Sequence, residues 1–130
     1  MFPITALYAS IFTGLFMRLA FDVIKLRRTH RVALGSGGFD DLESAIRAHG
    51  NFAEYVPLGL ILLGVLEANG GHPLLVVALG FMLLIARFFH AQGLKTADLQ
   101  KRVRAMKITF GTLSTLAVVN LLYIFKNWIG

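Results

Sequence analysis

Cysteine is absent from this chain of 130 residues. The protein can therefore form no disulfide framework, and it has no thiolate nucleophile of its own. Any thiol chemistry would have to come from a bound ligand. Metal-ligand spacings are also lacking, because the four histidines are scattered and none has a second ligand at the spacing of a zinc or haem site. We expect no metal site.

Acidic residues are scarce, with 7 Asp and Glu against 13 Lys and Arg and a formal net charge of +6. The basic residues stand beside apolar runs and do not form a basic domain, so membrane lipid headgroups are better partners than nucleic acid. The glycine-rich stretch 35–38 does not make a phosphate-binding loop. No strand precedes it and no Gly-Lys-Ser/Thr sequence follows it.

Apolar residues, by contrast, make up 56% of the chain, and the mean hydropathy is +0.68. This is too apolar for an ordinary soluble domain of this length. At a rise of about 1.5 Å per residue, a helix of about 20 apolar residues crosses the hydrocarbon core of a bilayer. We predict an all-α membrane protein, a single domain over residues 1–130. Its four transmembrane helices should span about 4–26, 45–66, 73–93 and 106–125.

Local features predict how these helices begin and end. Positive charges follow the first apolar run instead of preceding it, so this run is expected to be retained and not cleaved as a signal peptide. Within it, Arg18 and Asp22 stand four residues apart and are expected to pair. Asp40 and Glu43 fit a capping box that would start the second helix at about residue 41. Pro57 should kink that helix.

The distribution of basic residues predicts the orientation in the membrane. Both basic connections, between spans one and two and between spans three and four, should face the cytoplasm. Both termini should then lie on the non-cytoplasmic side, where only Lys126 is basic. The basic residues of the two connections are Lys25, Arg27, Arg28, Arg31, Arg47, Lys95, Lys101, Arg102, Arg104 and Lys107.

A polar cluster opens the second span, at residues 47–57. In a helix, Arg47, Asn51 and Glu54 share one face, and a cation, an amide and a carboxylate in one row can hold a zwitterion. The alternative is that Arg47 only reaches to the headgroups. Arg87 and His90, near the end of the third span, are either interfacial anchors or part of the same site. A basic pocket beside lipid would suit an anionic, water-soluble ligand that meets a lipophilic one.

The sequence Arg-Ala-His-Gly-Asn-Phe-Ala-Glu-Tyr-Val-Pro at residues 47–57 resembles the second-helix signature of a known membrane family. This is the family of membrane-associated proteins in eicosanoid and glutathione metabolism (MAPEG), which includes microsomal glutathione transferases. Residues 27–32 resemble the basic end of the family's first helix, residues 86–93 resemble the end of its third, and Arg102 precedes its fourth. The stretch 35–41 is similar to an uncharacterised bacterial branch.

This resemblance implies a homotrimer of four-helix bundles that binds glutathione, as cosubstrate, between neighbouring subunits. Arg102, or Arg104 two residues on, would hold the glutathione sulfur as thiolate. The other implied ligand-binding residues are Arg27 from the adjacent subunit, and Arg47, Asn51, Glu54, Tyr55 and His90. One position departs from the pattern: the family's synthases carry a tyrosine four residues after His90, and this chain has Leu94.

The function implied is that of a glutathione transferase or peroxidase-like enzyme in a bacterial inner membrane. An adjacent arginine that lowers the pKa of a thiol from about 8.5 by about two units makes the thiolate predominant at neutral pH. That thiolate would attack a lipophilic electrophile arriving from the bilayer. Two alternatives remain open: a non-catalytic binding or structural protein that keeps the fold, and a small transporter or proton-relay subunit using Arg18, Asp22 and Glu54.

Overall fold

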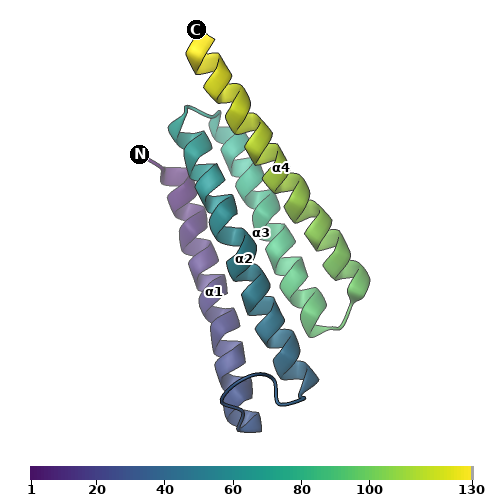
Figure 1. Ribbon diagram of the computed structural model, residues 1–130. Coiled ribbons are helices and arrows are strands. Elements are labelled where there is room, and N and C mark those ends of the chain that lie inside the picture. Colours follow the sequence, from purple (N-terminus) through teal and green to yellow (C-terminus); the bar gives the residue numbers. More distant parts are fainter. Residues whose placement is uncertain (130) are drawn as a thin grey trace.

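Four long helices follow one another in an up-and-down arrangement (Figure 1). The computed structural model describes residues 1–129. The helices are α1 (Pro3–His30), α2 (Asp40–Ala68), α3 (Pro73–Lys95) and α4 (Leu99–Ile129). Each is long and apolar enough to cross a membrane. Both ends of the described chain lie at one end of the bundle, and the α1–α2 and α3–α4 connections lie at the other. The prediction of an all-α protein with four long apolar helices is confirmed.

The start of α4 differs most from the predicted spans. The helix begins at Leu99, well before residue 106, and the break after α3 is short. Ala97 has a left-handed backbone conformation, with φ of 55°, and the Asp98 carboxylate accepts a 2.9 Å hydrogen bond from the Lys101 backbone N–H. Asp98 therefore caps the helix. The basic residues that follow are good helix formers, so the polar stretch expected to be a connection is the first turns of α4.

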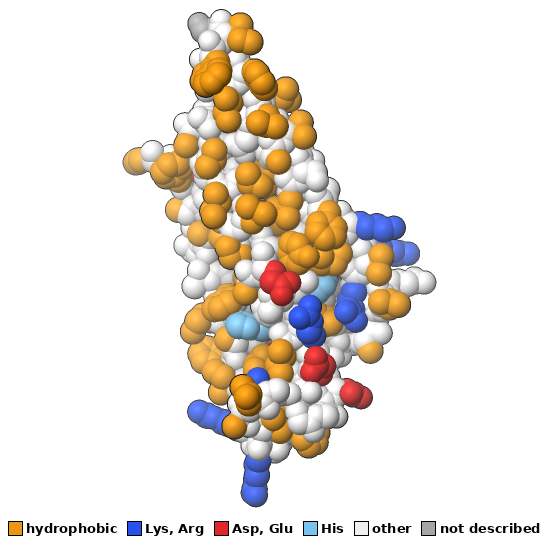
Figure 2. Space-filling model, viewed as in Figure 1, with side chains coloured by type: hydrophobic (Ala, Val, Ile, Leu, Met, Phe, Trp, Pro, Cys, Tyr) orange, Lys and Arg blue, Asp and Glu red, His pale blue; other side chains and the backbone are white. Residues whose placement is uncertain are grey.

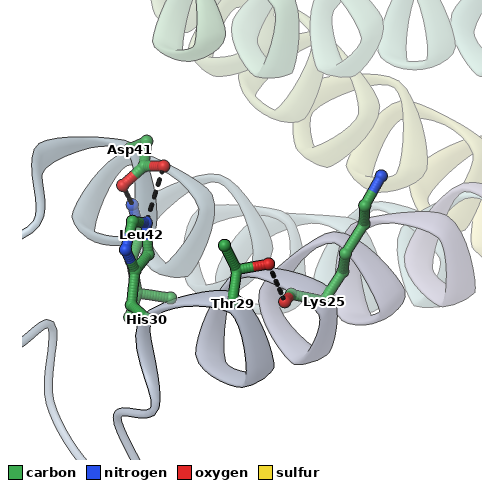
Figure 3. A network of polar contacts seen from close by, with 5 residues as sticks. All are labelled: Lys25, Thr29, His30, Asp41 and Leu42. Carbon is green, nitrogen blue, oxygen red and sulfur yellow. Dashed lines mark hydrogen bonds and ion pairs between the residues drawn. The ribbon is translucent and has the colours of Figure 1, made fainter.

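The start of α2 was predicted at the right place but for the wrong reason. The helix begins at Asp40, yet the residue before its first turn, Phe39, makes no side-chain cap, so the expected Asp40–Glu43 capping box is absent. Asp41 instead accepts a 2.9 Å hydrogen bond from His30 at the end of α1, and its other oxygen accepts one from the Leu42 N–H at 2.8 Å (Figure 3). These bonds join the end of α1 to the start of α2.

Tight packing of α1 on α3 depends on a glycine. The Tyr8 hydroxyl donates a 2.8 Å hydrogen bond to the Val77 carbonyl, and the Tyr8 ring lies directly over Gly80. A Cβ atom added at Gly80 would stand 2.3 Å from the ring atom Cε2, which is far inside van der Waals contact. Only glycine therefore allows the two helices to approach this closely.

The first turn of α1 is capped by a residue of another helix. The two carboxylate oxygens of Glu67, near the end of α2, accept hydrogen bonds from the backbone N–H groups of Ile4 (2.9 Å) and Thr5 (2.8 Å). Unpaired N–H groups at a helix start favour a negative charge. Glu67 therefore caps the start of α1 from the far end of α2.

Most of the outer surface is apolar, as expected for helices in contact with lipid. Figure 2 shows hydrophobic side chains over the upper part of the visible face, while charged and histidine side chains gather in its lower part. The lower part is the end of the bundle that carries the α1–α2 and α3–α4 connections. Polar groups of helices α2, α3 and α4 meet near this end, and they form the candidate site.

Candidate functional site

Arg87 is the centre of the polar cluster. It lies on α3 with only 2% of its surface exposed, so it is a buried residue and not an interfacial anchor. One guanidinium nitrogen donates a 2.5 Å hydrogen bond to the Asn51 side-chain oxygen on α2, and the other donates to the Thr109 hydroxyl on α4. The second nitrogen also contacts the Met106 sulfur at 3.4 Å. Arg87 thus ties three helices together.

Arg87 also holds Tyr55, one turn along α2 from Asn51. The guanidinium carbon lies 5.5 Å from the centroid of the Tyr55 ring, within the range of a cation–π contact. Tyr55 also contacts Phe110 of α4. The centroids of the two rings are 5.6 Å apart, and the rings meet edge to face. Two residues of the second-helix signature, Asn51 and Tyr55, are therefore oriented by the same buried arginine.

Sequence reasoning left Arg87 out of the binding residues, although a signal for its burial was present. Buried positions on α3 recur at intervals of three and four residues, the spacing of one helix face. One such series, taken from the ten buried residues of α3, is Val76, Gly80, Leu83, Arg87, His90 and Leu94. Arg87 falls in phase with the apolar members of this series, so the pattern alone could have placed it inside the bundle.

His90 lies one turn beyond Arg87 and is 6% exposed. Three arginines from three helices, Arg47, Arg87 and Arg102, are near enough for their charges to act on it. Concentrated positive charge of this kind favours an anionic ligand. The structure therefore places His90 near Arg47 and Arg102.

Arg102 and Arg104 occupy different surroundings. Arg102 is half-buried and packs on Gly93 of α3, where an added Cβ would stand 3.0 Å from the Arg102 Cγ atom. Its Nε atom is buried and has no hydrogen-bond partner among the residues that the structure describes. Arg104 is exposed and lines a separate pocket of about 310 Å³ beside Phe89 and Lys101.

Arg47 and Glu54, the charged members of the row on α2, are both exposed. Neither side chain makes a hydrogen bond or an ion pair within residues 1–129, so the expected row is not closed inside one subunit. Only its middle member, Asn51, is buried and bonded. The two free charges flank a fixed amide and remain open to a ligand or to another copy of the chain.

Arg27 is not part of this cluster. It is half-buried at the end of α1, and its guanidinium donates a 2.8 Å hydrogen bond to the carbonyl of Gly35 in the following loop. The expected pairing of Arg18 with Asp22, a separate prediction, is wrong. The Asp22 carboxylate instead lies 2.5 Å from the Lys95 ammonium nitrogen at the end of α3. Asp22 thus pairs with Lys95 of α3 and not with Arg18 of its own helix.

Leu94, the position that departs from the family pattern, is buried at 6% exposure. It lines a pocket of about 430 Å³ between α1, α2 and α3, together with Lys25, Asp41 and Ala45. The leucine thus contributes to packing on the α1 side of α3. Within the described residues, no three His, Asp or Glu side chains lie close enough to hold a metal ion.

Comparison with known proteins bears on what this cluster is. The model of the MAPEG family matches residues 5–122, nearly the whole chain. The chain belongs to the MAPEG family. It is also similar to a protein named inner membrane protein YecN in Escherichia coli strain K12 and in strain O6:H1. Each is 39% identical over 120 residues, which cover 92% of this chain and 92% of the relative. The four apolar helices of this MAPEG member are those of a membrane protein.

Proposed function

We propose that this MAPEG protein binds glutathione at the polar cluster and activates its thiol for attack on a lipophilic electrophile. The observation that carries the proposal is the buried Arg87, which holds Asn51 and Tyr55 in fixed positions beside two unpaired charges, Arg47 and Glu54. Glutathione carries both carboxylates and an ammonium group. A cation, an amide and a carboxylate in one row complement those groups.

Arg102 is the residue we propose to stabilise the thiolate. It stands near His90, and its buried Nε has no partner among the described residues, so this donor is unused. Arg104 is exposed in a different pocket, which makes it the weaker candidate. A fixed cation that lowers the thiol pKa by about two units is worth roughly 2.7 kcal/mol. This is a plausible contribution from an arginine in a partly dry site.

Each complete site is proposed to lie between two neighbouring subunits of a homotrimer. Arg47 and Glu54 lack partners in one subunit, and Arg27 is held to its own loop by Gly35, away from the cluster. In a homotrimer, the Arg27 of a neighbour could contact the ligand after releasing that loop contact. We further propose that the protein lies in a bacterial inner membrane with both termini outside the cytoplasm, as the basic connections favour.

A binding or structural protein without catalysis is the second candidate, and Leu94 is the observation that favours it. A leucine packed against α1 can donate no hydrogen bond to a thiol, whereas a tyrosine at this position could. Such a protein would still bind glutathione through the cluster but would leave its thiol protonated. The third reading, a proton relay through Arg18, Asp22 and Glu54, loses support because Asp22 pairs with Lys95.

The deciding experiment combines calorimetric titration of glutathione with ultraviolet absorbance of the bound thiolate, for the unmutated protein and for Arg102→Leu. We expect most of the affinity to remain in the variant and the thiolate signal to fall. The conjugation rate near neutral pH should drop about tenfold for each pKa unit lost and recover partly as the pH approaches about 8.5.

Arg104→Leu is the matched control, because it removes the same charge two residues away. It should leave the thiolate signal unchanged. If the unmutated protein binds glutathione without forming thiolate, the non-catalytic reading replaces the enzyme. If it does not bind glutathione at all, the proposed ligand is wrong.

A further inference from the structure

A groove of about 400 Å³ lies between α1 and α3, on residues that the candidate glutathione site does not use. On α3 the polar lining residues, Gln92 and Lys95, end the series, while on α1 Arg18 stands between two leucines. The other lining residues are apolar. The residues that line it are Leu15, Arg18 and Leu19 from α1, and Phe88, Ala91, Gln92 and Lys95 from α3.

Arg18 is the unbalanced charge of this groove. It is exposed, and its side chain has no hydrogen bond or ion pair within the part of the chain that the structure describes. The acid one turn away, Asp22, is already taken by Lys95 at 2.5 Å. One of the two cations in the groove is therefore neutralised and the other is not. A cation on a membrane-facing surface is costly unless an anion or water meets it.

The depth of the groove can be inferred from the same ion pair. The bond between Asp22 and Lys95 puts this part of α1 level with the last residue of α3, where a spanning helix meets the headgroups. Gln92 also lies at this level. Its side-chain oxygen accepts a 3.1 Å hydrogen bond from the Lys101 ammonium group, and its side-chain N–H groups remain available as donors. Leu15 and Phe88 continue the groove toward the middle of the helices.

We propose that this groove is a binding site for one anionic phospholipid. The phosphate binds Arg18, with the Gln92 amide as a second donor, and an acyl chain lies along the apolar residues toward Leu15. Charge complementarity selects an anionic headgroup over a zwitterionic one, whose own cation would meet Arg18. The apolar part of the groove requires an attached chain, so a lipid and not free phosphate is the ligand. Such a lipid would join α1 to α3.

The test uses the full-length protein in nanodiscs that contain equal amounts of phosphatidylglycerol and phosphatidylcholine. Native mass spectrometry then counts the lipids that stay bound after release. We expect one phosphatidylglycerol to be retained in preference to phosphatidylcholine, and Arg18→Gln to reduce this preference about fivefold. That change corresponds to about 1 kcal/mol for one cation facing an anionic membrane.

Arg28→Gln is the matched control, because it removes the same charge from an exposed position of α1 outside the groove. Arg28→Gln should leave the preference for phosphatidylglycerol unchanged. Arg18→Lys, which keeps the charge, should retain most of this preference. Inorganic phosphate added in excess should not displace the lipid; displacement by phosphate alone would mean that only the headgroup is recognised. No preference in the unmutated protein, or equal loss in Arg18→Gln and Arg28→Gln, would overturn the proposal. Glutathione affinity is measured in parallel, so that failure of one site is not mistaken for failure of the other.

Discussion

Arg87 of α3 donates a 2.5 Å hydrogen bond to the side-chain oxygen of Asn51 on α2, and both residues are buried. The second guanidinium nitrogen serves Thr109 on α4. These bonds connect the polar row of α2 to the packing of α3 and α4. The orientation of the Asn51 side chain therefore depends on the packing of α2, α3 and α4 together.

The first prediction follows from this geometry. Arg87→Lys keeps the charge but cannot reach Asn51 and Thr109 together, because lysine has a single donor nitrogen where arginine has a planar fork. We expect the free energy of unfolding to fall by about 1–3 kcal/mol, the cost of leaving a buried polar group unpaired. Thermal unfolding in detergent measures this change. Arg28→Lys, the same substitution at an exposed position, should have almost no effect, and an equal loss in both would contradict the role of Arg87.

The second prediction concerns the free charges of the site. Arg47→Ala and Glu54→Gln should each weaken glutathione binding by more than about tenfold, because each leaves a ligand charge without its partner. Both side chains are exposed in the single subunit, so neither variant should unfold. Calorimetric titration measures the affinities. Lys107→Ala, which removes an exposed charge from α4, serves as the control and should leave the affinity unchanged. Unchanged affinity in both Arg47→Ala and Glu54→Gln would show that the ligand does not bind beside these two residues.

The third prediction is that the protein assembles as a homotrimer. Chemical cross-linking in native-like lipid should yield species of one, two and three subunits and stop there. The physical reason is that Arg47 and Glu54 stand unpaired in one subunit, on a helix that also exposes Leu58 and Ile61, and a neighbouring copy can cover this surface. A protein that stays monomeric under these conditions would remove the basis for a shared site.

The fourth prediction concerns the contact between α1 and α3. Gly80→Ala should destabilise the bundle by about 1–3 kcal/mol, because the new methyl group would push the Tyr8 ring away and strain its hydrogen bond to Val77. Gly111→Ala on α4 is the matched control, since nothing lies within 4 Å of the position its Cβ would take. Thermal unfolding should separate the two variants; equal stability would show that α1 can shift without cost.

The fold could be predicted from the sequence because apolar runs of bilayer length appear four times between polar connections. Helix ends were harder. The sequence could not show that Asp98 would cap α4 early, or that Lys95 would take Asp22 from Arg18, because both depend on where a second helix lies. The same holds for Glu67, whose partners in α1 are more than sixty residues away in the chain.

The candidate site was predictable in its parts but not in its connections. The spacing of Arg47, Asn51 and Glu54 predicted a candidate binding face on α2, and the resemblance added His90 and Arg102. The sequence left open whether Arg87 is an interfacial anchor or part of the site, and it did not show that the residue is buried. Arg87 stands four residues after Leu83, on the same face of α3, and this spacing could have predicted that it is buried.

The bond from Glu67 to the first turn of α1 has a consequence for biosynthesis. During translation, the first turn of α1 is made more than sixty residues before Glu67, so its first N–H groups must wait for their acceptor. The α1–α2 hairpin is therefore the shortest nascent chain in which the first span can be complete. A ribosome stalled before Glu67 would hold a helix whose leading end still depends on water or lipid headgroups.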